Sequence, residues 1–431
     1  MSHTELLSPA GSLKALRLAF AYGADAVYAG QPRFSLRVRN NEFDLDNLAS
    51  GINTAHDLGK KLYVVTNIAP HNAKLQNFIG DMAPVVDLKP DAMIVSDPGI
   101  IALMREHFPH MPLHLSVQAN TMNWAAVKFW QSIGIERVIL SRELSINEIA
   151  EIKQRCPEIE LEVFVHGALC MAYSGRCLIS SYVNKRDANQ GACTNACRWN
   201  YQTHSAQESE QDLIPVQTYT PEPKSIFVEQ AEHPGELFAL EEDEHGSYLF
   251  NSKDLRAVEQ VEKLIAAGVD SLKIEGRTKS PYYVARTAQV YRRAIDDASA
   301  GRAFNPELLS ELDGLANRGY TAGFLQRHTP VSLQNYQQGS SRGESQQLVG
   351  EVIAQLGPQE LQIDVKNRFT QQDQLLLLTP EGNYRFNPEA IINKQGDTIE
   401  VAPGSGHIVR LMVPHSVNGE HAMLVKIHGE P

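Results

Sequence analysis

Short apolar runs alternate with amphipathic stretches from residue 5 to residue 299 of the chain. Four runs share one phrase, in which an acidic residue follows the turn and a β-rich apolar stretch comes next: 23–29, 89–95, 134–140 and 268–274. Three of the four phrases begin with glycine, which commonly ends a helix in the left-handed conformation. Each phrase therefore predicts a helix end, a tight loop and a buried strand.

Further strands and helices are predicted between these phrases. The strands are expected at 5–7, 61–68, 113–117, 161–165 and 248–250. Apolar residues at helical spacing predict helices over 13–22, 45–58, 125–133, 146–155 and 257–267, and another over 281–299. Strand–helix alternation is typical of a parallel sheet covered by helices, so we expect an α/β fold, a (β/α)8 TIM-like barrel. The alternative is an open doubly wound sheet, which is less favoured because no glycine-rich dinucleotide turn follows the first strand.

Two segments break the alternation. Residues 200–246 are polar and acidic, and predict an insertion over the barrel top or a small added sheet. Residues 334–346 form a Gln/Ser/Gly-rich linker. Beyond the linker, short strands separated by turn residues predict a small all-β barrel or sandwich: 348–353, 361–365, 374–378, 398–401, 408–413 and 423–427. The predicted domains are a catalytic barrel over 1–333 and a small β-barrel domain over 347–431.

Composition narrows the class of protein. No long apolar run is present, which argues against a membrane span, and the first residues do not resemble a secretory signal. With five cysteines, a disulfide scaffold is not expected, and the cytoplasm is the expected compartment. The net charge of −12 does not favour a nucleic-acid partner, so any RNA site must be a local basic patch.

Four of the five cysteines cluster after the predicted strand at 161–165: Cys170, Cys177, Cys193 and Cys197. This position is the carboxyl-terminal mouth of a barrel, where barrel active sites lie. Four thiolates bind either zinc or an iron–sulfur cluster. Zinc ligands usually come in close pairs, whereas the first two cysteines are separated by six residues and a fifteen-residue gap follows. The spacing favours an iron–sulfur cluster and leaves zinc, or four buried structural cysteines, as alternatives.

The stretch from Glu162 to Ser180, with Gly167, Cys170 and Cys177 in register, resembles the signature of the collagenase-like "peptidase U" family. The phrases at 251–255 and 273–277 resemble that family too, and the likeness covers essentially the whole chain. The chain is most similar to members that modify tRNA. The resemblance implies a [4Fe–4S] cluster on the four cysteines. It also implies oxygen-independent hydroxylation of the tRNA wobble uridine to 5-hydroxyuridine, with prephenate as hydroxyl donor and tRNA as partner.

The same family includes members described as collagenases, so a peptidase is an alternative function. A protease needs an activated nucleophile or a metal-bound water. The sequence contains no His-Glu-x-x-His motif, and its Gly-x-Ser-x-Gly motif at 339–343 falls in the predicted linker rather than on a strand–turn–helix elbow. The other alternative is a non-catalytic, metal-stabilised RNA-binding protein.

Charged residues near two predicted strands are candidates for binding the donor. They are Lys253, Asp254, Lys273, Glu275 and Arg277. The last three alternate along a predicted strand and would share one face. If that face lines the mouth, they would bind a dicarboxylate such as prephenate, because arginine pairs with carboxylates in a bidentate manner. The alternative is a salt-bridge network that closes the barrel.

Basic residues beside aromatic ones are the candidate RNA contacts. They are Arg33, Arg37 and Arg39 around Phe34, and Lys185, Arg186 and Arg198 beside Trp199. Such groups suit a phosphate backbone and a flipped-out base, and the β domain is expected to grip RNA. For any single residue, ordinary surface charge is the alternative. We assign His166 no catalytic role.

Overall fold

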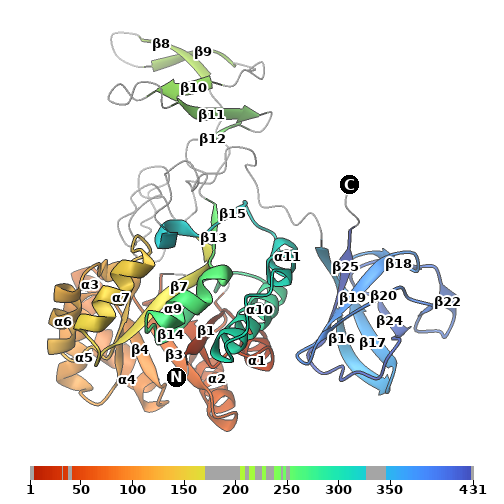
Figure 1. The fold of residues 1–431 in the computed structure, drawn as a ribbon, viewed down its shortest axis with the longest axis horizontal. Coiled ribbons are helices and arrows are strands. Elements are labelled where there is room, and N and C mark those ends of the chain that lie inside the picture. Colours follow the sequence, from red (N-terminus) through yellow and green to blue (C-terminus); the bar gives the residue numbers. More distant parts are fainter. Residues whose placement is uncertain are drawn as a thin grey trace.

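The computed structural model describes residues 4–31, 33–36, 41–169, 253–326 and 346–428, together with the backbone of five strands between residues 204 and 248. Eight parallel strands form a closed barrel (Figure 1): β1 Glu5–Ala10, β2 Ala26–Gly30, β3 Lys61–Thr66, β4 Ala92–Val95, β5 Leu113–Leu115, β6 Arg137–Ile139, β7 Glu160–Ala168 and β14 Ser271–Ile274. The last strand closes the barrel, since β14 pairs with both β1 and β7. The predicted (β/α)8 barrel is confirmed.

Helices lie on the outside of the barrel. Their bounds are α1 Leu13–Ala21, α2 Leu45–Asp57, α3 Asn72–Leu75, α4 Phe78–Asp87, α5 Pro98–His107, α6 Trp124–Ser132, α7 Ile146–Arg155, α9 Val261–Ala266, α10 Pro281–Ser299 and α11 Glu307–Asp313, with short 3-10 turns at Val117–Ala119, Val258–Gln260 and Gly323–Gln326. Side chains cap several of them: Ser145 and Glu148 form a capping box on α7, and Ser280 caps α10 ahead of Pro281. Among the described residues, no helix is long and apolar enough to cross a membrane.

The sequence phrase repeated at 23–29, 89–95, 134–140 and 268–274 forms the loop between a helix and the next strand. In three of the four phrases, the acidic residue accepts a hydrogen bond from the first part of the neighbouring strand: Asp25 does so from Leu6 N at 2.9 Å, and Asp91 from Leu62 N at 2.8 Å. Asp270 accepts from Leu161 N in the same way. The turn residue is left-handed in all four phrases, because the three glycines and Lys89, at φ 57°, have positive φ. Each loop thus ends a helix, and the aspartate in three of the loops also fixes a strand against its neighbour.

Two parts of the chain depart from the barrel repeat. Residues 204–248 contain five strands that form antiparallel pairs: β8 His204–Glu208, β9 Leu213–Thr218, β10 Ile226–Glu229, β11 Leu237–Asp243 and β12 Gly246–Tyr248. The predicted barrel strand at 248–250 is therefore wrong, because Tyr248 ends a strand that pairs with β11. Short strands β13 Asp254–Arg256 and β15 Tyr320–Thr321 extend the sheet beyond β7.

The carboxyl-terminal domain is all-β, as predicted. Its strands are β16 Gln346–Gly357, β17 Glu360–Val365, β18 Phe369–Thr370, β19 Gln374–Leu378, β20 Asn383–Phe386, β21 Ile391–Ile392, β22 Thr398–Ile399, β23 Val401–Ala402, β24 Ile408–Met412 and β25 Met423–Ile427. Eight of them form one antiparallel sheet in the order β20-β19-β25-β16-β17-β24-β21-β22, and β18 pairs with β23. This domain has a hydrophobic core of its own.

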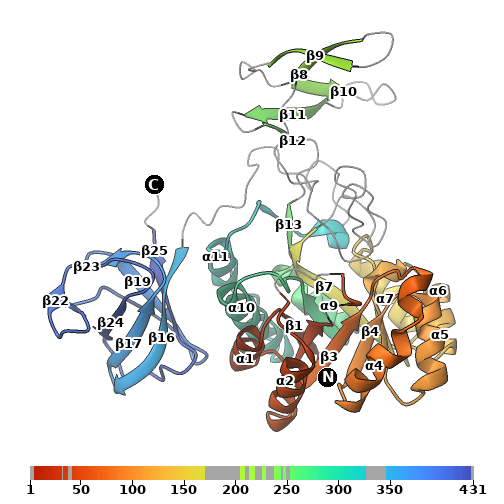
Figure 2. The same ribbon diagram turned by 180° about the vertical axis from the view of Figure 1, so that it is seen from behind.

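The β domain packs against the barrel beside α1 and α10 (Figures 1 and 2). Tyr22, at the end of α1, donates its hydroxyl to the carbonyls of Leu378 and His421, both at 3.0 Å. From α10, Gln289 donates to the carbonyl of Thr379 at 2.8 Å. Four apolar side chains of β19 and β25 belong to the barrel's hydrophobic cluster: Leu376, Leu378, Met423 and Val425. The two domains therefore share a buried boundary.

Candidate active site at the barrel mouth

The carboxyl ends of the parallel strands meet at one mouth, which is where barrel active sites lie. Strand β7 ends at Ala168, two residues before Cys170 in the sequence. The four cysteines lie outside the described residues, as do Arg37, Arg39, Lys185, Arg186, Arg198 and Trp199. Their predicted roles stay predictions.

Lys273 lies inside the barrel, below the mouth. Its ammonium contacts the Glu162 carboxylate at 2.6 Å and lies 4.3 Å from the centre of the Tyr28 ring. Burial lowers the pKa of Lys273, and the Glu162 carboxylate opposes that fall. For this residue, the geometry matches the salt-bridge alternative.

Glu275 and Arg277 lie beyond the strand that was predicted to carry them. Strand β14 ends at Ile274 after an irregularity in its pairing with β7, so the predicted alternation does not extend through Arg277. The Arg277 guanidinium reaches back over the Tyr28 ring and donates to the Ser35 hydroxyl. Glu275 accepts a hydrogen bond from Ala168 N at 3.3 Å. Both side chains therefore belong to the mouth.

Gly30, at the end of β2, provides the space for Arg277. A Cβ at this position would overlap the Arg277 Nη1 atom and lie 2.7 Å from the Ser35 hydroxyl. No larger residue fits without displacing the guanidinium.

Asp254 has a structural partner. Its carboxylate forms an ion pair with Arg318, and both side chains are buried. Lys253 is half-buried and precedes β13. The five predicted donor contacts therefore do not share one place. Lys273 lies in the barrel interior, Glu275 and Arg277 lie at the mouth, and Asp254 forms an ion pair beside it.

Sequence reasoning missed Arg142, which follows β6. Its guanidinium lies 4.0 Å from the centre of the Phe164 ring and donates to the Ala168 carbonyl at 3.0 Å. It also missed an amide network at the ends of β3 and β5. Asn67 donates to the Ser116 hydroxyl and to the Gln118 side chain, both at 3.0 Å. The rule that residues directly after barrel strands build the site would have found these residues.

Arg33 is the one predicted RNA contact that the structure describes. Its side chain is 59% exposed and forms an ion pair with Asp81 at 2.7 Å. Phe34 is buried and packs edge-on against Phe78, so it offers no free face to a base. The exposed Arg33 side chain is compatible with a phosphate contact.

His166 is packed behind the mouth. Its Nδ1 lies 3.3 Å from the Tyr291 hydroxyl, and the rings of Tyr283 and Tyr320 also surround it. Burial lowers its pKa to about 3, so the imidazole is neutral near pH 7. This environment favours a packing role.

At the opposite, amino end of the barrel, buried charges pair with one another. Arg137 contacts Glu5 at 2.6 Å and Glu162 at 3.2 Å, and Tyr63 donates to Glu5 at 2.6 Å. Burial alone would raise the pKa of Glu5, but the Arg137 guanidinium brings it below its usual value.

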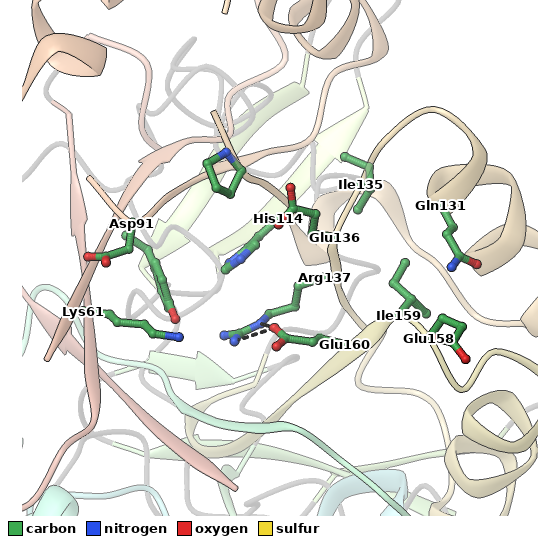
Figure 3. A pocket seen from close by; sticks show the side chains of 12 residues that line it. Lys61, Asp91, His114, Gln131, Ile135, Glu136, Arg137, Glu158, Ile159 and Glu160 are labelled. Atoms are coloured by element: carbon green, nitrogen blue, oxygen red, sulfur yellow. Dashed lines mark hydrogen bonds and ion pairs between the residues drawn. The ribbon is translucent and has the colours of Figure 1, made fainter. Parts of the chain in front are cut away.

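A cavity of about 580 Å³ opens beside these charges (Figure 3). Its walls come from the starts of strands, including Lys61 on β3, His114 on β5 and Arg137 on β6, whose side chains point toward one another. The Nδ1 atom of His114 is buried and has no hydrogen-bond partner among the described residues. Barrel active sites lie at the carboxyl ends of the strands rather than at the amino ends. We therefore place the candidate site at the carboxyl mouth.

Comparisons with known proteins show which proteins this chain is similar to. A tRNA hydroxylation protein P of Escherichia coli (strain K12) is 58% identical over 440 residues, which cover 99% of this chain and 97% of the relative. The 23S rRNA 5-hydroxycytidine C2501 synthase of the same organism is 34% identical over 292 residues, covering 68% of this chain and 39% of that protein. An uncharacterized protease of Methanocaldococcus jannaschii is 38% identical over 335 residues, covering 76% and 74%.

The family models account for both domains. The model of peptidase family U32 matches residues 11–335, and the model of the U32 C-terminal domain matches residues 344–425. The chain belongs to peptidase family U32.

Proposed function

We propose that this protein hydroxylates tRNA, converting the wobble uridine to 5-hydroxyuridine without molecular oxygen and with prephenate as hydroxyl donor. The observation that carries the proposal is the 58% identity, over nearly the full length of both chains, to a tRNA hydroxylation protein. The similarity to an rRNA hydroxycytidine synthase supports the same reaction class.

The reaction replaces the hydrogen on C5 of the base by a hydroxyl group. The base formally gains one oxygen atom and the donor loses one, so oxygen and electrons balance between the two substrates. A base in an RNA stack is not accessible to such chemistry, and it has to be flipped out into a pocket. A barrel mouth lined by arginines and amides suits both the anionic donor and the hydrogen-bonding edge of a base.

The cysteines are the candidate ligands of a [4Fe–4S] cluster. Within the described residues, no group of three or more His, Cys, Asp or Glu side chains is arranged to hold a metal. The clustered thiols of Cys170, Cys177, Cys193 and Cys197 have the donor chemistry that such a cluster needs. When bound, the cluster would supply one-electron transfer or organise the mouth.

A deletion strain tests the proposal. We expect its tRNA to lack 5-hydroxyuridine-derived nucleosides by mass spectrometry, and the wild-type gene to restore them. Cys170→Ala and Cys193→Ala should fail to restore them and should lose the visible absorption of the protein purified without oxygen. Cys156→Ala is the matched control, because Cys156 is a free, buried cysteine at the end of α7.

Normal tRNA nucleosides in the deletion strain, together with a colourless protein, would overturn the proposal. The peptidase function and the non-catalytic RNA-binding function would then be reopened.

A further inference from the structure

An amide network joins three loops at the carboxyl mouth of the barrel. Asn67, directly after β3, donates through Nδ2 to the Ser116 hydroxyl and to the Gln118 Oε1 atom, both at 3.0 Å. Ser116 follows β5, and Gln118 lies in the 3-10 turn Val117–Ala119. The Ser96 hydroxyl, after β4, donates to the Asn67 carbonyl at 3.0 Å. The network is therefore held by the ends of neighbouring strands.

One backbone amide sets the direction of the hydrogen bonds in this network. Leu36 N, in the loop after β2, donates to Asn67 Oδ1 at 3.3 Å. A backbone N–H can only donate, so Asn67 turns its oxygen toward Leu36 and its two N–H groups toward Ser116 and Gln118. Gln118 meets the Asn67 and Ser116 donors with its Oε1 atom. A Gln118 amide turned the other way would place donor against donor.

The nitrogen of the Gln118 amide is the free end of this network. Asn67 and Ser116 are 7% and 2% exposed, whereas Gln118 is only half-buried. Within the described part of the chain, both side-chain hydrogen bonds of Gln118 are accepted by Oε1. Asn120 donates to the Gln118 carbonyl at 2.9 Å and ends the turn at φ 52°. Gln118 is thus held at its backbone and its oxygen, while the two N–H groups on Nε2 remain for a ligand.

An amide that presents only donors distinguishes the two pyrimidine bases. Uracil carries a carbonyl oxygen at position 4, which accepts a hydrogen bond, whereas cytosine carries an amino group there, which donates. Position 4 is next to C5, the carbon at which the proposed hydroxylation takes place. A donor directed at position 4 therefore pairs with uracil and opposes a second donor on cytosine.

We propose that Gln118 selects uridine over cytidine by donating from Nε2 to O4 of the flipped-out base. The inference rests on the proposed function, because it assumes that a uridine is presented to the mouth. It assigns Gln118 a role in specificity and no part in making or breaking bonds. Asn67 and Ser116 are positioning residues, since they act through the orientation of the Gln118 amide.

The test uses the full-length protein, prepared without oxygen, and two anticodon stem-loop RNAs that differ only in uridine or cytidine at the wobble position. Fluorescence anisotropy would measure the dissociation constant of each RNA. We expect the uridine RNA to bind at least about tenfold more tightly. Gln118→Glu still offers one oxygen to Asn67 and Ser116 but presents an acceptor to the base. It should remove or reverse the preference, because an acceptor suits the cytosine amino group.

Gln131→Glu is the matched control, because it makes the same change at a half-buried glutamine of the amino-end cavity. The added negative charge should weaken both RNAs alike, so the ratio of the two dissociation constants should stay at its wild-type value. Gln118→Leu adds no charge. It should weaken the uridine RNA by about tenfold and leave the cytidine RNA unchanged, and it decides the test alone if Gln118→Glu does not fold.

Equal binding of the two RNAs by the wild type, or a preference that the Gln118 variants retain, would overturn the inference. The nucleoside analysis of the deletion strain reports on hydroxylation separately. If the wild-type gene restores 5-hydroxyuridine and either of these binding results is found, Gln118 loses its role and the tRNA function stands. If the wild-type gene forms no 5-hydroxyuridine, the proposed function itself fails.

Discussion

The two ends of the barrel use buried charge differently. At the amino end, Arg137 is held between Glu5 and Glu162, so its charge is compensated by the protein itself. At the carboxyl mouth, Arg142 and Arg277 lie over aromatic rings and donate to a carbonyl and a hydroxyl. Charges that the protein itself compensates hold the amino end of the barrel together, whereas the guanidiniums described at the mouth lie against aromatic rings and neutral hydrogen-bond acceptors.

Removing Arg137 should have the largest effect. Arg137→Met leaves Glu5 and Glu162 buried beside an apolar side chain, and we expect the free energy of unfolding to fall by about 3–5 kcal/mol. Denaturant unfolding monitored by circular dichroism would measure it. Lys61→Ala, at the exposed edge of the same cavity, should change stability by less than about 0.5 kcal/mol. Equal effects of the two variants would contradict the contrast between the ends.

A smaller effect is expected from pH, through His166. Its folded pKa of about 3 lies below the unfolded value, so the unfolded chain binds a proton that the folded chain does not. Stability is therefore full above about pH 6.5 and falls as the pH drops toward 3, by about 2 kcal/mol at pH 5.

Unfolding measured from pH 7 to pH 5 would check this, because His166→Gln should lose that part of the decline. His110→Gln, at an exposed histidine, is the control and should follow the wild type. A wild-type decline that persists unchanged in His166→Gln would assign the pH dependence to other groups.

The smallest expected effect concerns Gly30, which lies against Arg277 at the mouth. Gly30→Ala places a methyl group where the Arg277 guanidinium lies, so we expect the free energy of unfolding to fall by about 1 kcal/mol. Gly80→Ala is the control, because a Cβ there meets no atom within 4 Å. Denaturant unfolding would compare them, and an unchanged free energy of unfolding in Gly30→Ala would show that the Arg277 guanidinium leaves this position at no cost.

Much of the barrel was predictable because its loops repeat a local signal. The phrases at 23–29, 89–95, 134–140 and 268–274 each mark a strand, and all four strands were found. Helix α5 was missed although Asp97 caps it and Pro98 begins it, which are both readable signals. The pattern of α4 is less regular, since Pro84 lies inside the helix.

The contacts of the site were less predictable, because they join residues far apart in the chain. Glu5 and Arg137 are 132 residues apart, and Arg277 and Ser35 are 242 apart. Periodicity assigns a residue to a face of its own strand but does not select its partner. The irregularity after Lys273 also ended a strand that simple alternation would have continued to Arg277.

The closing strand has a consequence for the order of events during synthesis. Glu5 pairs with Ser271, which leaves the ribosome 266 residues later. Until then, β1 and the first part of β7 are unpaired edges of a seven-stranded sheet, and unpaired edges invite association with other chains. The cysteine stretch and the inserted strands are both made before β14, so we expect the nascent barrel to stay open while the four clustered cysteines emerge.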